Sequence, residues 1–396
     1  IALPNRSLDG LWETLVFEEP IPEYLLRTII RMISLSEDPR LGPADMCWHN
    51  LILLHGPPGS GKSTLAKGLA QKLSIRLASV YPVTKFIEVK SHALLSKFFG
   101  ESGKLVGKLF DAIVGASVDD NLLTVVLIDE VESLAASRAK ASQANDISDA
   151  IRSTNELLRG IDKLRSRPNV VLVCTSNLIE NMDLAFVDRC GVKQYVGEPN
   201  FEAAYEIVRS VINKLIKTGL VYFTLTMDCG QECGSNSQST NISSNSYPSQ
   251  LDEVSPSLES ESPNLTEDLN SIPELAWARL QLSHHGNTTA AKLESISQLA
   301  TGLSGRTLRR LPWLALARYT VDEPCSLAEL LTALEKVVLE EAQSSTPEET
   351  ESKVDEELTK KGHAGSVQDQ TSSDTDDLLA HEMEGILKDM TRLGGL

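Results

Sequence analysis

The sequence has few cysteines, no long apolar run and no excess of basic charge, and each absence excludes a class of protein. Its six cysteines lack the spacing of a disulfide framework, which favours a reducing, intracellular compartment. No apolar run approaches the ~20 residues that a membrane-spanning helix needs, so we predict no membrane partner. Cys229 and Cys233 have no second Cys or His pair nearby, which favours free thiols over a metal site.

The net charge of −18 is confined to two segments of the chain. Residues 221–275 contain nine acidic residues and no Lys or Arg, and residues 341–396 contain fourteen acidic and five basic residues. The remaining 285 residues hold 32 charges of each sign. The part expected to fold therefore has no broad basic surface, and we predict no direct binding of nucleic acid.

Residues 50–200 alternate short apolar runs with stretches of helical periodicity. The apolar runs, typical of buried parallel strands, lie at 50–54, 86–90, 125–128 and 170–174. After the first run, Leu65, Leu69 and Leu73 fall on one helix face. This alternation predicts an α/β domain over residues 1–200, with helices on both faces of a parallel sheet.

The second half of the chain shows only helix-like patterns between long polar segments. A small all-helical domain is predicted over 201–341, interrupted at about 221–273 by a Ser-, Asn- and acid-rich insertion. This insertion, like the acidic tail at 342–396, cannot bury enough apolar surface to offset its ordering entropy, so both are predicted to be disordered. Within the tail, residues 378–390 have helical spacing, for which a transient amphipathic turn is favoured over a recognition helix.

The stretch HGPPGSGKST at 55–64 matches the pattern G-x-x-x-x-G-K-[ST] between a predicted strand and a predicted helix. Glycines let backbone N–H groups converge on phosphate at a helix N-terminus. Lys62 then reaches the β- and γ-phosphates, and the Ser63 hydroxyl is a ligand for Mg²⁺. We therefore predict that the chain binds ATP and Mg²⁺. The predicted nucleotide-binding residues are Gly56, Pro57, Pro58, Gly59, Ser60, Gly61, Lys62, Ser63 and Thr64.

Two later strands end in polar residues that suit hydrolysis of a bound nucleotide. The run VVLIDE ends in Asp129, which we expect to hold the Mg²⁺ shell through water, and Glu130, which we expect to polarise the attacking water. The run VVLVCTSN ends in Asn177, a neutral amide suited to positioning the same water. The alternatives are a strand-to-helix cap for the acidic pair and a turn cap for Asn177.

Together these residues resemble an AAA+ ATPase, and longer runs resemble the pachytene checkpoint protein family of AAA+ remodelers. The similarity covers about residues 1–220 and 275–341. The runs that carry it are GLWETLVFE (10–18), LLHGPPGSGKSTLAKGLAQKLSIRL (53–77), LLSKFFGESGKLVGKLF (94–110), VLIDEVESLAASR (126–138), SDAIRSTNELLRGIDKL (148–164), TSNLIENMDLAFVDRCGVKQYVGEP (175–199) and GLSGRTLRRLPWLALA (302–317). The resemblance implies an AAA+ P-loop core followed by a helical lid.

The family resemblance also implies a function. Members are homohexameric rings that use ATP to convert HORMA-domain proteins from closed to open states, often with a HORMA-type adaptor. They act in meiotic chromosome-axis and recombination checkpoint control and, in many organisms, in the spindle checkpoint, which implies nucleus, chromosomes and also cytoplasm. The family has an N-terminal domain that binds substrate and adaptor. Because the chain begins with Ile1 close to the core, we expect it to be a processed form or a fragment without that domain.

Several residues take expected roles from the resemblance alone. Arg189 resembles the arginine finger that reaches the neighbouring subunit's γ-phosphate, and Arg306 resembles the second sensor on the lid. The planar, permanently charged guanidinium suits both roles, and a surface ion pair is the alternative for each. Residues 10–12 resemble the segment that lines the adenine, although Trp12 fits a core position equally well.

A substrate-gripping pore loop is also implied by the resemblance. It would consist of Lys97, Phe98, Phe99 and Gly100, with Phe98 facing the channel, and two core aromatics are the alternative. Residues 135–146 resemble a second pore-facing loop.

Three other functions compete with ATP-driven remodelling of a protein. A DNA-directed AAA+ machine of the clamp-loader or origin type is opposed by the neutral core and acidic extensions. A microtubule-severing AAA+ enzyme shares the pore-loop pattern but is disfavoured by the runs GLWETL and LSGRTLRRLP. A nucleotide-bound scaffold without hydrolysis is disfavoured by the complete set of predicted catalytic residues.

Overall fold

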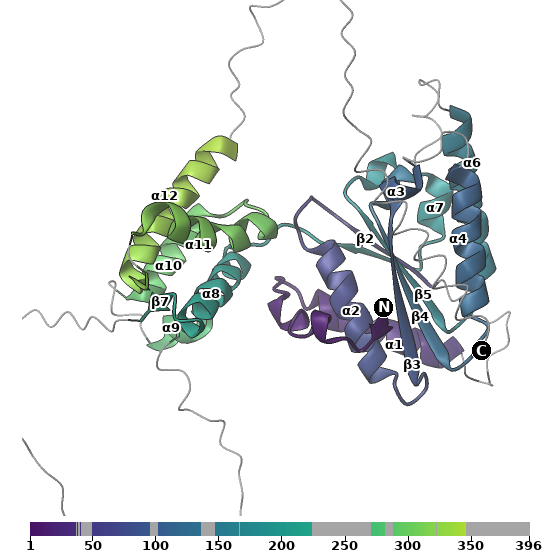
Figure 1. Ribbon diagram of the computed structural model, residues 1–396, viewed down its shortest axis with the longest axis horizontal. Helices are drawn as coiled ribbons and strands as arrows, with labels where there is room; N and C mark the ends of the chain where they lie inside the picture. The colour runs from purple at the N-terminus through teal and green to yellow at the C-terminus, as the bar shows by residue number, and fades with distance from the viewer. Residues whose placement is uncertain are drawn as a thin grey trace, which may run out of the picture.

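The computed structural model contains an α/β unit and a helical lid, joined by the chain around residues 196–201 (Figure 1). The structure describes residues 1–36, 38, 40, 50–95, 102–135, 147–165, 167–223, 271–281, 288–321 and 323–345. None of the helices in these ranges is both long and apolar enough to cross a membrane.

A six-stranded sheet with the order β1-β3-β4-β5-β2-β6 forms the centre of the α/β unit. Its strands are β1 Ala2–Leu3, β2 Leu51–His55, β3 Val83–Lys90, β4 Leu122–Asp129, β5 Val170–Ser176 and β6 Val192–Tyr195. Only β1 pairs in the antiparallel direction, and every other neighbouring pair is parallel. The four predicted strands are confirmed as β2 to β5. The two outer strands, β1 and β6, had no sequence signal because they are short.

Helices cover both faces of this sheet, as predicted (Figure 1). On one face α4 and α6 pack over Leu53 and Val126, and on the other α1 and α2 pack over Leu54 and Leu127. Successive residues of one strand thus enter opposite cores, which explains the continuous apolar runs. The helices and 3₁₀ helices of this unit are η1 Arg6–Leu8, η2 Trp12–Thr14, α1 Ile21–Ser36, α2 Lys62–Arg76, α3 Ser91–Leu95, α4 Ser102–Ala116, η3 Val131–Ser133, α6 Ile147–Leu164, η4 Ile179–Asn181 and α7 Leu184–Asp188.

The lid packs its helices around one apolar core that includes Tyr205, Leu308 and Leu334. Its helices are α8 Phe201–Lys217, α9 Leu275–Gln281, α10 Thr289–Leu299, α11 Gly305–Tyr319 and α12 Leu327–Ser345. The helical lid is confirmed, with one addition that the sequence did not indicate. Two short strands, β7 (Val221–Tyr222) and β8 (Cys325–Ser326), pair in parallel beside the helices.

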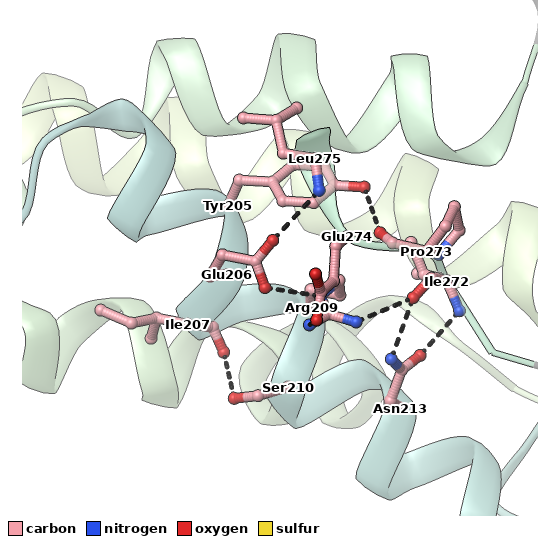
Figure 2. Close-up of polar contacts among 10 residues, drawn as sticks. All are labelled: Tyr205, Glu206, Ile207, Arg209, Ser210, Asn213, Ile272, Pro273, Glu274 and Leu275. Carbon is pink, nitrogen blue, oxygen red and sulfur yellow. Dashed lines mark hydrogen bonds and ion pairs between the residues drawn. The ribbon is translucent and has the colours of Figure 1, made fainter. Parts of the chain in front are cut away.

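The chain returns to the lid at Ser271, and polar side chains of α8 bind it there (Figure 2). Asn213 accepts from the backbone N–H of Ile272 at 2.9 Å and donates to its carbonyl at 3.1 Å. The Tyr205 hydroxyl donates to the Pro273 carbonyl at 2.9 Å, and Arg209 donates to the Ile272 carbonyl at 3.2 Å. Ile272 is fully buried in the lid core.

These contacts correct the predicted boundaries of the polar segments. The insertion predicted at about 221–273 is shorter at both ends, because residues 221–222 form β7 and residues 272–273 are held by α8. At the other end of the lid, α12 continues to Ser345, past the predicted limit of 341. Residues 224–270 and 346–396 lie outside the described part of the chain.

The crossing of α4 and α6 generates a stability prediction. A Cβ atom added at Gly160 in α6 would lie 2.2 Å from the ring of Phe110 in α4, which is itself buried. Gly160→Ala should therefore lower the free energy of unfolding by about 1–3 kcal/mol despite a better helix propensity, because the ring must move in a packed core. Thermal unfolding measures this effect.

Gly115→Ala in α4 is the matched control, because a Cβ there meets nothing within 4 Å. That variant should be neutral or more stable than the parent. Equal melting temperatures for Gly160→Ala and Gly115→Ala would contradict the tight crossing.

Candidate active site

The glycine loop joins β2 to α2 and has a backbone that only glycine adopts easily. Gly56, Gly59 and Gly61 have φ values of 147°, 78° and 96°. A Cβ on Gly56 would lie 2.1 Å from the carbonyl oxygen of Val196, and one on Gly59 would lie 2.7 Å from the Ser304 hydroxyl of the lid. The spacing of glycines in the motif thus reflects both backbone conformation and close contact with neighbouring segments.

Lys62 begins α2 and folds its side chain back into this loop. Its Nζ donates to the carbonyl oxygens of Gly56 at 2.9 Å and Pro57 at 2.7 Å, and the residue is only 6% exposed. Burial lowers the pKa of Lys62, and the carboxylates of Glu132 and Asp129 act in the opposite direction. A polyphosphate at the loop would likewise favour the charged ammonium.

The predicted metal ligands Ser63 and Asp129 meet at the end of the central strands. The Ser63 hydroxyl donates to Asp129 Oδ1 at 2.7 Å. Thr175, at the end of β5, also donates its hydroxyl to Oδ1, and it accepts the backbone N–H of Glu130 at 3.1 Å. Sequence reasoning did not single out Thr175, because nothing in a linear motif marks a contact across 46 residues.

Glu130 occupies the turn that follows β4. It has φ 56° and ψ 49°, and it is the one non-glycine with positive φ among the described residues. Its side chain is 52% exposed, and its Oε2 lies 3.8 Å from His92 Nδ1 of α3. A carboxylate next to the phosphate loop and open to solvent can accept a proton from water.

Asn177 follows β5 at the same edge of the sheet. Its backbone N–H donates to Glu132 Oε1 at 3.1 Å, whereas the other carboxylate oxygen of Glu132 is buried and has no hydrogen-bond partner in the described part of the chain. The turn cap considered for Asn177 is provided by its neighbour, since Ser176 Oγ accepts the N–H of Leu178. The Asn177 side chain is therefore not required for that cap.

The lid contacts the phosphate loop through the first turn of α11. Ser304 caps this helix by accepting the N–H of Thr307, and the backbone N–H of Arg306 donates to the Gly59 carbonyl at 3.2 Å. Arg306 is exposed there, and its positive charge acts on Lys62. The structure thus places the predicted second sensor beside the phosphate loop.

Arg189 lies away from this group, just after α7. Its guanidinium binds both carboxylate oxygens of Asp162 in α6, at 2.8 and 3.0 Å, and donates to the Ala185 carbonyl at 2.8 Å. The hydrogen bonds to Asp162 raise the pKa of Arg189. Within one chain the ion pair is therefore formed, and a role in a neighbouring site stays a prediction.

The predicted adenine-lining segment and the pore loops make none of the contacts described above. Trp12 is partly buried and packs on α2 beside Gly68, with Lys72 over its ring, and its role at the adenine stays a prediction. Lys97, Phe98, Phe99 and Gly100 lie outside the described residues, as do residues 136–146 of the second loop. The pore-loop roles therefore stay predictions.

The oxygen ligands at this site suit a nucleotide bound as its Mg²⁺ complex. Ser63 and Asp129 offer hard oxygens, and no hydrogen bond to Asp129 Oδ2 is found among the described residues. Mg²⁺ is usually held by one or two protein oxygens together with substrate phosphates, to which it supplies neutralising charge. In the described part of the chain, no cluster of three His, Cys, Asp or Glu side chains could hold a metal ion without such phosphates.

Comparison with protein families matches both units of the chain. Residues 52–198 match the ATPase family associated with various cellular activities (AAA). Residues 254–342 match the TRIP13-like, AAA+ ATPase lid C-terminal domain.

Curated relatives named pachytene checkpoint protein 2 homolog align with most of the chain. The zebrafish (Danio rerio) relative is 39% identical over 86% of this chain and 70% of its own length. The chain belongs to the pachytene checkpoint protein 2 family. The rice (Oryza sativa subsp. indica) relative is 40% identical over 84% of the chain, and the human relative is 37% identical over 85%. The chain spans 64% of the rice protein and 68% of the human protein.

Two solved structures share this fold. The C. elegans PCH-2 structure has a TM-score of 0.64 and 32% identity, covering 86% of this chain and 74% of the other. An E. coli Trip13 structure, solved as a HORMA:CdnC:Trip13 complex, has a TM-score of 0.55 and covers 85% of this chain and 93% of its own. At 17% identity, the E. coli likeness shows the fold alone.

Glu130→Gln tests the role of the exposed carboxylate. The variant should bind ATP, because Lys62, Ser63 and Asp129 are untouched, but it should lose a factor of about 10² or more in its rate of hydrolysis, since the amide cannot act as the base that accepts the proton. Phosphate release and nucleotide binding, measured side by side, check this. Glu335→Gln, the same change at an exposed residue of α12, is a control expected to keep parental turnover, and unchanged turnover in Glu130→Gln would refute the assignment.

Proposed function

We propose that this chain hydrolyses ATP as its Mg²⁺ complex and, as a homohexamer, uses the energy to remodel HORMA-domain proteins. One arrangement supports the catalytic part of this proposal. The Ser63 hydroxyl binds Asp129 at the end of β4, Lys62 is buried in the phosphate loop, and Glu130 is exposed to solvent after β4. The lid adds Arg306, whose N–H binds the same loop. Membership of the AAA ATPase and pachytene checkpoint protein 2 families supports the same proposal.

Each residue has a distinct part in the proposed hydrolysis. Lys62 and the loop N–H groups bind the phosphates, and Ser63 and Asp129 hold the cation shell. Glu130 accepts the proton of the attacking water, whose position Asn177 fixes from the end of β5. Arg306 supplies positive charge from the lid to the phosphates.

The contact between lid and loop suggests how hydrolysis is coupled to motion. The N–H of Arg306 binds the carbonyl of Gly59, so the first turn of α11 rests on the segment that holds phosphate. Loss of the γ-phosphate removes negative charge beside Arg306 and weakens the hold on the lid. The lid then changes its position relative to the sheet, and in a ring this motion acts on the neighbouring subunit.

The substrate class is proposed from the family rather than from a described contact. Relatives carry the name of a pachytene checkpoint protein, and the E. coli protein of the same fold was solved with a HORMA protein. We propose action with a HORMA-type adaptor in meiotic and spindle checkpoint control, in the nucleus, on chromosomes and in the cytoplasm. The TRIP13-like lid supports this over clamp-loader, origin or microtubule-severing machines.

The test is ATP hydrolysis with and without a closed HORMA-domain protein and its adaptor, together with an assay of the HORMA conformer. We expect stimulated hydrolysis and conversion to the open form. Phe98→Ala should keep basal hydrolysis and lose conversion if the side chain grips a threaded polypeptide, whereas Phe98→Tyr should keep both because its ring is retained. Basal hydrolysis without stimulation or conversion would leave an ATPase and overturn the remodelling role.

The hexamer proposal predicts complementation between two inactive variants. Arg189→Ala and Lys62→Ala should each lose a factor of about 10³ or more in the rate of ATP hydrolysis. Mixed subunits should regain activity, because an intact Lys62 loop can then face an intact Arg189. Phosphate release from mixtures of varied ratio measures this.

Asp162→Ala is the matched control for Arg189→Ala. It breaks the same ion pair but keeps the guanidinium, so it should retain most activity if Arg189 acts on a neighbouring subunit. Equal losses in Asp162→Ala and Arg189→Ala, with no rescue on mixing, would reduce Arg189 to a structural ion pair.

A further inference from the structure

We propose that Thr175 is a positioning residue that fixes both acidic residues of the ATP site through one hydroxyl group. Its Oγ1 donates to Asp129 Oδ1 and accepts the backbone N–H of Glu130 at 3.1 Å. Thr175 is 2% exposed and is the second-last residue of β5. This strand pairs with β4, which ends at Asp129. No other described side chain hydrogen-bonds to both residues.

The first effect of this hydroxyl is on the carboxylate of Asp129. Ser63 and Thr175 approach from α2 and β5, and both donate to the same oxygen, Oδ1. Two donors on one oxygen fix the rotation of the carboxylate and leave Oδ2 to accept hydrogen bonds from cation-bound water. With Ser63 alone, the carboxylate would have one anchor, and that anchor is itself a predicted metal ligand.

The second effect is on the backbone at Glu130. A non-glycine residue in the left-handed region costs about 1–2 kcal/mol, so neighbouring contacts must hold it there. The Thr175 oxygen binds the N–H at the start of this turn. The same hydroxyl therefore orients the metal-shell acid and determines where the side chain of the base begins.

A merely structural role for the hydroxyl is disfavoured by a comparison within the sheet. Thr124 near the other end of β4 also buries its hydroxyl, but that oxygen has no hydrogen-bond partner among the described residues. Pairing of β4 at Thr124 therefore does not use a hydrogen bond from that hydroxyl to another described residue. The hydroxyl of Thr175 differs in that both of its partners are predicted catalytic residues.

The proposal rests on the proposed ATP chemistry and is tested with Thr175→Val, which keeps shape and removes the hydroxyl. Turnover should fall about 10-fold to 100-fold, and the Mg²⁺ concentration for half-maximal binding of a non-hydrolysable ATP analogue should rise several-fold. Binding of the analogue in EDTA should stay at the parental level, because Lys62 and the loop are unchanged. Thr175→Ser should restore turnover and the Mg²⁺ dependence.

Thr124→Val, the same substitution one strand away, should match the parent in turnover and in Mg²⁺ dependence, and it should melt at the parental temperature or above, because the hydroxyl that it removes is buried without a hydrogen bond to any described residue. An unchanged Mg²⁺ dependence in Thr175→Val would overturn the proposal. It would also be overturned if the Val and Ser variants both bound the analogue more weakly in EDTA, and melted at a lower temperature, to the same extent. Thr175→Ala is measured in parallel, and unfolding of both Ala and Val variants would assign the hydroxyl a structural role and also overturn it. If the parent itself fails to hydrolyse ATP, the proposed function fails, whereas the Mg²⁺-dependent binding still decides the role of Thr175.

Discussion

The parallel pairing of β4, β5 and β2 is the constraint on which the site depends. In a parallel sheet the carboxyl ends of neighbouring strands lie at one edge, so residues far apart in sequence meet there without any local signal. The register that sets Ile128 opposite Cys174 and His55 opposite Ser176 brings together the phosphate loop, the acidic pair and Thr175. A shift of one residue would exchange the two faces of a strand and move the apolar side chains out of their cores.

Much of this arrangement could be predicted because it depends on local sequence patterns. Continuous apolar runs indicated β2 to β5, and the phosphate loop was identified because its glycines are needed within a few residues of each other. The strands β1, β6, β7 and β8 are two to four residues long, too short to show a periodicity. Their positions depend on pairing with distant strands.

The contacts that could not be predicted join residues that are distant in the chain. The hydroxyl of Thr175 lies 46 positions from Asp129, and Arg189 pairs with Asp162 across 27 positions. A motif identifies residue types suited to a role, but it cannot show which of two partners an arginine takes. The prediction for Arg306 required only that the residue lie beside the phosphate loop. It lies there because it belongs to the capped first turn of α11, which contacts the loop.

The contacts of α8 with residues 272–275 make the lid a two-part assembly. Helix α8 is continuous with the ATPase unit, whereas α9 to α12 follow 47 residues that lie outside the described structure. In the proposed cycle, force passes between the two parts of the lid through the buried side chains between α8 and α11 and the hydrogen bonds of Asn213 and Arg209, so the strength of these noncovalent contacts would set the mechanical load that the lid can carry.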